Sequence, residues 1–172
     1  ANVMRVTDGL FRDVCREVAK RYPDIAFNEL YVDAASMRLI KEPQDFDVLC
    51  TCNMFGDILS DEAAQLIGGL GMAPGANIGD TFALFEPIHG SAPNRVGKQT
   101  ANPLSMILAA KMMLDWLGEK YGDQKCLEAA NAIEEAVVVT LRAHNTIPDL
   151  GGKTTTIGMA EAIAAEISQK KG

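Results

Sequence analysis

Residues 46–62 read FDVLCTCNMFGDILSDE. The first part, residues 46–52, is a continuous apolar run of strand length, which is typical of a buried strand. Gly56 and Asp57 then form a turn that opens a helix, and we predict this helix to run to about Ile67. Because a buried strand that leads into a helix is the building unit of α/β proteins, this stretch predicts the α/β class.

Two aspartates of this stretch, Asp57 and Asp61, are four residues apart and therefore lie one turn apart on one face of the expected helix. Like charges at this spacing repel, so the pair is best explained by a cation between them. A third carboxylate, Asp33, follows a predicted strand at residues 25–32, and open α/β sheets place ligands at strand ends. Three oxygen donors suit Mg²⁺ or Mn²⁺. The alternative is a helix N-cap at Asp57 and a solvated face at Asp61.

The remaining pattern is mostly helical. Helical periodicity predicts helices at residues 8–21, 34–40, 104–119, 124–143 and 157–169, with one more strand at residues 81–85. Glycines crowd residues 68–79, where we expect a hinge or a crossing between domains. The few predicted strands are too few for a complete doubly wound sheet, and the chain begins at Ala1 rather than at a methionine. We therefore expect part of a longer protein.

Composition excludes some kinds of binding partner and indicates the compartment of the protein. The chain has 172 residues, 48% of them hydrophobic, and a formal net charge of −7. This charge argues against nucleic acid as a partner, and no apolar run is long enough for a membrane span. The four cysteines show no framework of a small secreted domain, and Cys50 and Cys52 are expected to be a buried structural pair. These features favour the reducing cytoplasm.

A second candidate site is the segment HGSAPNRVGKQTAN at residues 89–102. Gly90 would let the backbone approach a ligand, Ser91 and Asn94 offer hydrogen bonds, and His89 offers a ring for stacking. The segment lacks the Gly-x-Gly-x-x-Gly fingerprint, so a standard dinucleotide fold is not indicated. Its composition alone fits either a nucleotide-binding loop or a polar surface loop.

Several motifs together resemble the decarboxylating β-hydroxyacid dehydrogenases, which include the 3-isopropylmalate, isocitrate and homoisocitrate dehydrogenases. They are, in chain order, ANVM at 1–4, TDGLF at 7–11, YVDAA at 31–35, GDILSDE at 56–62, FEPIHGSAP at 85–93, ANP at 101–103 and DLGG at 149–152. The resemblance implies the C-terminal half of such an enzyme, with its α/β fold incomplete in this chain. Residues 1–70 would be part of the small dimer-forming domain, and residues 71–172 the C-terminal part of the large cofactor-binding domain.

The resemblance also implies roles for individual residues. Asp57 and Asp61 match metal ligands of one subunit, whereas Asp33 matches a catalytic aspartate that reaches the same Mg²⁺ or Mn²⁺ across a dimer interface. The cofactor would be NAD, although NADP is close behind, because Asn94 stands where NAD-using members carry an acid and Arg95 could pair with a phosphate. The residues implied in cofactor binding are Asn2, His89, Gly90, Ser91, Ala92, Asn94, Arg95 and Asn102.

The catalytic lysine, the catalytic tyrosine and the substrate-binding arginines of the family would all precede Ala1, so we expect the chain alone to be inactive. Its expected partners are a second copy of the chain, the missing N-terminal half and a small malate-type hydroxy acid. Among such acids 3-isopropylmalate ranks narrowly ahead of isocitrate and homoisocitrate. Alternatives of another class are a non-catalytic regulatory subunit and an inert fragment, which predict no Mn²⁺ site dependent on Asp57 and Asp61.

Overall fold

The computed structural model describes residues 1–169, which divide into two compact units. The N-terminal unit comprises residues 1–63, and the C-terminal unit begins at Ala64. Among the described residues, no helix is both long enough and apolar enough to cross a membrane.

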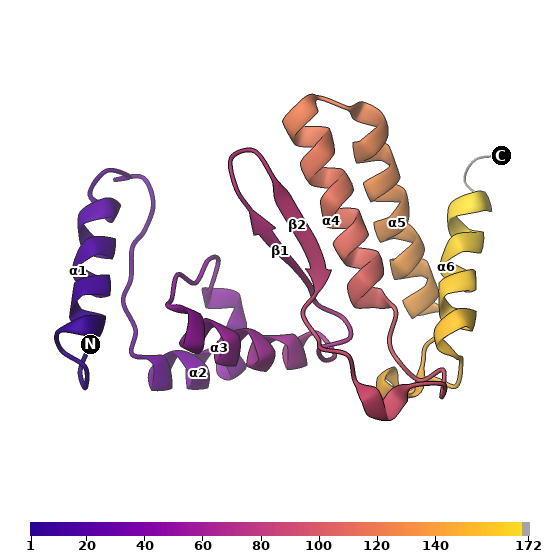
Figure 1. Ribbon diagram of the computed structural model, residues 1–172, viewed down its shortest axis with the longest axis horizontal. Coiled ribbons are helices and arrows are strands. Elements are labelled where there is room, and N and C mark those ends of the chain that lie inside the picture. Colours follow the sequence, from indigo (N-terminus) through magenta and orange to yellow (C-terminus); the bar gives the residue numbers. More distant parts are fainter. Residues whose placement is uncertain (170–172) are drawn as a thin grey trace. The chain divides into compact units, whose positions relative to one another are not determined.

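The N-terminal unit is helical (Figure 1). Its elements are α1 (Thr7–Ala19), α2 (Val32–Lys41), the short 3-10 helix η1 (Pro43–Asp45) and α3 (Asn53–Leu66), whose last turn belongs to the second unit. An ion pair between Arg16 and Glu29 connects α1 to the chain that follows it. The hydroxyl of Ser36 on α2 donates to both carboxylate oxygens of Glu62 on α3, at 3.0 and 2.8 Å.

The apolar side chains of this unit are poorly covered. Ala35, Leu39 and Leu59 are buried, but the side chains of Leu10 and Val48 are exposed to 68% and 87%. Single exposed apolar residues are common, whereas a unit that leaves most of its large apolar side chains in water has surface that a partner normally covers.

The C-terminal unit combines one hairpin with a layer of helices. Its elements are β1 (Pro74–Ile78), β2 (Ala83–Pro87), η2 (Pro93–Arg95), α4 (Leu104–Tyr121), α5 (Gln124–Arg142), η3 (Pro148–Leu150) and α6 (Thr156–Gln169). Strands β1 and β2 are antiparallel, with Pro74 opposite Pro87 and Ile78 opposite Ala83. Helix α4 packs against both strands and against α5, which in turn packs against α6 (Figure 1).

The core of this unit lies where the three helices meet, and it consists of Leu104, Ala136, Val137, Ile147, Met159 and Ile163. The turn of the hairpin is fastened to α4 by Lys120, whose ammonium group donates to the carbonyl oxygens of Asp80 and Thr81 at 2.9 and 2.8 Å. The same ammonium group lies 4.3 Å from the ring centre of Trp116, so a cation–π contact adds to this attachment.

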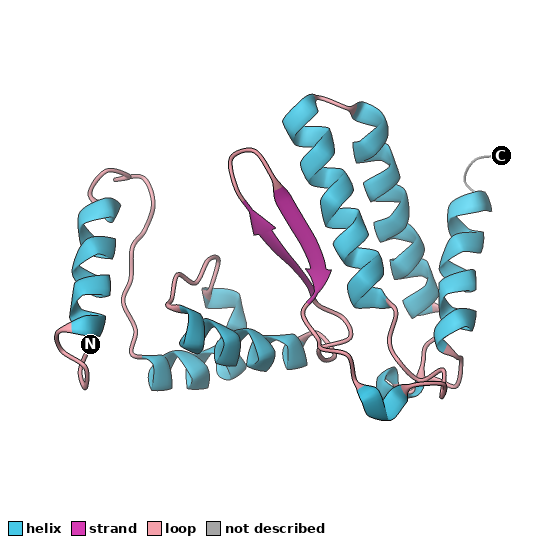
Figure 2. Ribbon diagram, in the orientation of Figure 1, coloured by secondary structure: helices cyan, strands magenta, loops and turns pink. Residues whose placement is uncertain are grey.

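The helices are confirmed, since all five periodic segments form helices within a few residues of the predicted ends. The strands predicted at residues 25–32 and 46–52 are wrong: the N-terminal unit contains no strand in the part that the structure describes (Figure 2). Both segments are irregular, and Val32 already belongs to α2. A strand requires hydrogen bonds to a neighbouring strand, and within residues 1–169 nothing pairs with these two segments.

Three further features differ from what the sequence predicts. Strand β1 lies in the segment expected to be a hinge or domain crossing, because proline and glycine in Pro74–Ile78 count against a strand. Helix α3 begins at Asn53 rather than at the Gly56-Asp57 pair, so Asp57 lies inside the helix. Cys50 and Cys52 are exposed instead of buried, because the segment that carries them has no sheet to cover it.

Candidate functional site

The first candidate site lies on α3, which carries Asp57 and Asp61 one turn apart on an exposed face. The side-chain amide of Asn53, in the preceding turn, donates from Nδ2 to Oδ2 of Asp57 over 3.2 Å. This bond orients the Asp57 carboxylate and leaves its other oxygen available. Sequence reasoning did not assign Asn53 a role, although its place four residues before Asp57 in the quoted stretch is the signal for it.

Asp33 lies at the start of α2, where its Oδ1 accepts the backbone N–H of Ala34 at 2.8 Å. Among residues 1–169, no three histidine, cysteine, aspartate or glutamate side chains are close enough together to hold a metal ion. The structure therefore does not bring Asp33 to Asp57 and Asp61 within one chain. The α3 pair fits a hard divalent cation in the chemistry of its donors and needs further ligands from elsewhere.

The second candidate site is the loop between β2 and α4. The two ends of this loop differ in their hydrogen bonds to the rest of the unit. Its C-terminal part is fastened to the start of α6: the backbone N–H of Thr156 donates to the carbonyl oxygen of Gln99 at 2.9 Å, and the Thr156 hydroxyl donates to that of Ala101 at 2.6 Å. The guanidinium of Arg95 donates to the carbonyl oxygen of Thr100 at 2.6 Å. Arg95 thus stabilises the conformation of the loop, a role that the sequence did not predict.

The N-terminal part of the loop is open. A Cβ atom built on Gly90 would meet no atom within 4 Å, and the side chains of Ser91 and Asn94 are exposed. Ala92 has a left-handed backbone with φ of 42°, which turns the chain into η2. His89 is half-buried, and its Nδ1 lies 2.9 Å from the carbonyl oxygen of Gly90. Backbone and polar side chains here are accessible to a ligand.

Asn102 lies at the C-terminal end of the loop, with its side chain inside the unit. It is buried, and its Oδ1 accepts the backbone N–H of Leu104 at 3.0 Å, at the start of α4. Its Nδ2 has no hydrogen-bond partner among residues 1–169. Gly71 lies against this side chain so closely that a Cβ on it would be 2.5 Å from Cβ of Asn102. An unpaired buried donor costs about 1–3 kcal/mol, so Asn102 is a group that an acceptor would satisfy.

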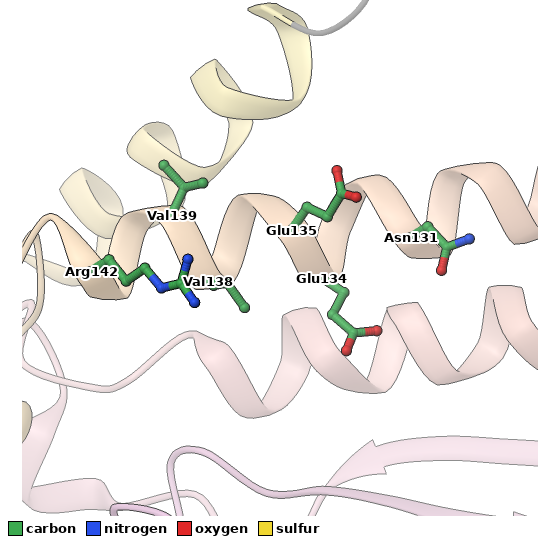
Figure 3. Close-up of a pocket in the computed structure, with 6 residues that line it drawn as sticks. All are labelled: Asn131, Glu134, Glu135, Val138, Val139 and Arg142. Atoms are coloured by element: carbon green, nitrogen blue, oxygen red, sulfur yellow. The ribbon is translucent and has the colours of Figure 1, made fainter.

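The last predicted cofactor contact, Asn2, is exposed and belongs to the N-terminal unit, whereas the loop belongs to the C-terminal unit. An open pocket of about 510 Å³ elsewhere in the C-terminal unit is lined by none of the predicted residues (Figure 3). Its lining comes from α5 alone, and the side chains of one helix face cannot enclose a ligand. The lining residues are Asn131, Glu134, Glu135, Val138, Val139 and Arg142.

Comparison with known proteins matches residues 1–165 to the isocitrate/isopropylmalate dehydrogenase family. The chain belongs to this family. One relative, 3-isopropylmalate dehydrogenase of Archaeoglobus fulgidus, is 53% identical over 165 residues, which are 96% of this chain and 48% of the relative. Isocitrate/homoisocitrate dehydrogenase of Thermus thermophilus is 52% identical over 95% of this chain and 47% of its own length.

The same family appears among solved structures. The crystal structure of isocitrate dehydrogenase from Methylococcus capsulatus superimposes with a TM-score of 0.90 at 49% identity, covering 97% of this chain and 48% of that one. The chain therefore spans about half the length of the family members that it matches. Relatives with different substrate names are almost equally similar to it, so identity alone does not choose a substrate.

Proposed function

We propose that this chain is the C-terminal half of a metal-dependent, NAD(P)-linked dehydrogenase that oxidises and decarboxylates a malate-type 2-hydroxy acid. Within this class 3-isopropylmalate ranks first, ahead of isocitrate and homoisocitrate. The observation that carries the proposal is the exposed Asp57 and Asp61 pair on α3, with Asn53 orienting one of the two carboxylates.

In this proposal Asp57 and Asp61 hold Mg²⁺ or Mn²⁺, and Asp33 of a second copy completes the site. The bound cation would supply charge stabilisation as electrons move toward the hydroxy acid's oxygen and CO₂ leaves. The chain's own aspartates position that charge, and Asn53 keeps Asp57 in the ligating orientation. Asp33, as the catalytic residue, would hold and move a proton next to the substrate.

The nucleotide would lie against the open part of the loop at residues 89–94. Gly90 leaves room for close approach, while Ser91 and Asn94 offer hydrogen bonds to the adenosine. Asn102 is assigned to the same site by the family resemblance, and its Nδ2 is buried without a partner among residues 1–169. We expect the remaining contacts with the nucleotide to come from Asn2, His89, Ala92 and Arg95.

We also propose two macromolecular partners, a second copy of the chain and the N-terminal half of the enzyme. The large exposed apolar side chains of the N-terminal unit and the open edges of the two-stranded sheet support them. Unpaired strand edges readily accept further strands. The free thiols of Cys15, Cys50, Cys52 and Cys126 support a reducing compartment, for which we propose the cytoplasm.

Complementation tests this proposal. The chain is mixed during refolding with the N-terminal half of the Archaeoglobus fulgidus relative, and NAD or NADP reduction is followed with each of the three hydroxy acids and Mn²⁺. We expect activity only when both halves and the metal are present, with 3-isopropylmalate used best. A stable complex of the two halves without activity on any of the acids would contradict the proposed function.

A single substitution in the loop addresses the nucleotide. Asn94→Asp is expected to shift the ratio of NAD to NADP affinity about tenfold toward NAD, because the new carboxylate repels a 2′-phosphate and accepts from the ribose hydroxyls. The measurement is a titration of the complemented enzyme with each nucleotide. Asn145→Asp, at an exposed asparagine outside this loop, adds the same charge and should leave the ratio unchanged. Equal shifts in both variants would rule out a local effect at Asn94.

A further inference from the structure

Two cysteines of the N-terminal unit line one pocket of about 360 Å³. Cys15 comes from α1, and Cys50 comes from the irregular segment that leads into α3. The other side chains around the cavity are nearly all apolar: Val14, Val18, Ala19, Tyr22, Ile25 and Phe27. Both cysteines are free, and no metal-binding group of three forms among residues 1–169, so the pair is not explained by a metal site.

Cys15 and Cys50 line the same pocket and are therefore neighbours in the fold of this unit. Burial raises the pKa of the Cys15 thiol above its ordinary value, and the charge and hydrogen bonding of the neighbouring Cys50 thiol raise it further. Cys15 is half-buried, whereas Cys50 is exposed. Because the thiolate at an accessible position reacts first with oxidants, the geometry gives the two residues different roles, with Cys50 on the outside and Cys15 behind it.

We propose that Cys15 and Cys50 form a reversible disulfide that couples α1 to the segment entering α3. This inference does not rest on the dehydrogenase function proposed above. The bond would close the chain between residues 15 and 50, and Cys50 lies three residues before Asn53, where α3 begins. Oxidation would therefore restrict the segment next to the helix that carries Asp57 and Asp61.

The chemistry requires a two-electron oxidant, for which a peroxide suffices. Hydrogen peroxide converts the Cys50 thiol to a sulfenic acid and is itself reduced to one molecule of water. The sulfur of Cys15 then attacks the sulfenic sulfur, which releases a second molecule of water and forms the S–S bond. A dithiol reductant reverses the reaction through a mixed disulfide.

The test is oxidation of the 172-residue chain with hydrogen peroxide, followed by alkylation and digestion with trypsin and Asp-N protease under non-reducing conditions. We expect a linked pair of peptides, residues 13–16 with residues 47–56, that a reductant separates. Fragmentation between residues 50 and 52 identifies which cysteine is bonded. A bond from Cys15 to Cys52, a bond between Cys50 and Cys52, or only bonds between chains would overturn the proposal.

Variants supply the matched controls. Cys50→Ser should abolish the linked peptide pair, whereas Cys52→Ser, at a cysteine two residues away that is also exposed, should retain it. Cys126→Ser, in the other unit, should also retain it. Because the unchanged chain reports the linkage by its peptides, the proposal stays testable even where a variant fails to fold. Loss of the linkage in Cys52→Ser with a folded protein would contradict it.

Discussion

Asp61→Asn is expected to lower the affinity of the chain for Mn²⁺ by more than about 100-fold, and Asp57→Asn by a similar factor. Replacing a residue that only orients a metal ligand typically costs about 10–100-fold, and loss of the ligand itself costs more. An amide also lacks the negative charge that a hard divalent cation requires. The measurement is the signal of free Mn²⁺ in electron paramagnetic resonance as the protein is titrated.

Two further variants distinguish a specific Mn²⁺ site on α3 from nonspecific attraction of Mn²⁺ to a negatively charged surface. Asn53→Ala removes only the 3.2 Å bond to Asp57 and should cost about tenfold. Asp24→Asn, at an exposed aspartate elsewhere in the same unit, changes the charge equally and should have no effect. If the four variants bind Mn²⁺ alike, the α3 pair is a solvated face, and the regulatory or inert interpretation becomes the better one.

Mixing variants tests whether Asp33 comes from a second copy. A dimer of one Asp33→Asn chain and one Asp57→Asn/Asp61→Asn chain keeps one intact set of ligands, because each chain supplies what the other lacks. Random exchange of subunits should then restore about a quarter of the wild-type Mn²⁺ sites, although neither variant binds alone. No recovery after demonstrated exchange would place all ligands within one chain.

The parts of the fold that depend on local patterns were predictable. Apolar residues at helical spacing predicted the helices, and the i, i+4 spacing placed Asp57 and Asp61 on one face of α3. The segments at residues 25–32 and 46–52 have strand-like composition, but strand formation depends on distant partners that composition does not specify. For the same reason the fit of Gly71 against Asn102 and the attachment of the loop to Thr156 had no signal in the sequence.

One motif of the resemblance now has a physical explanation. In the DLGG segment at residues 149–152, a Cβ built on Gly152 would lie 1.8 Å from the carbonyl oxygen of Thr146. That oxygen also accepts the backbone N–H of Thr154 at 3.0 Å, and the neighbouring Ile147 is fully buried in the core. The backbone at Thr146 therefore cannot move away without breaking a hydrogen bond and disturbing the core, so this position requires glycine.

Gly152→Ala is accordingly expected to lower the free energy of unfolding of the C-terminal unit by ~3 kcal/mol, the upper end of the usual cost of overpacking. Urea unfolding followed by fluorescence measures this unit selectively, because the single tryptophan of the chain, Trp116, lies on α4. Gly90→Ala is the matched control: the same methyl group there meets no atom within 4 Å, and the free energy of unfolding should stay within about 0.5 kcal/mol of the wild-type value. If the two variants unfold at the same urea concentration, the backbone around Thr146 can move to accept the extra methyl group. The glycine of the DLGG motif would then need a functional explanation instead of a steric one.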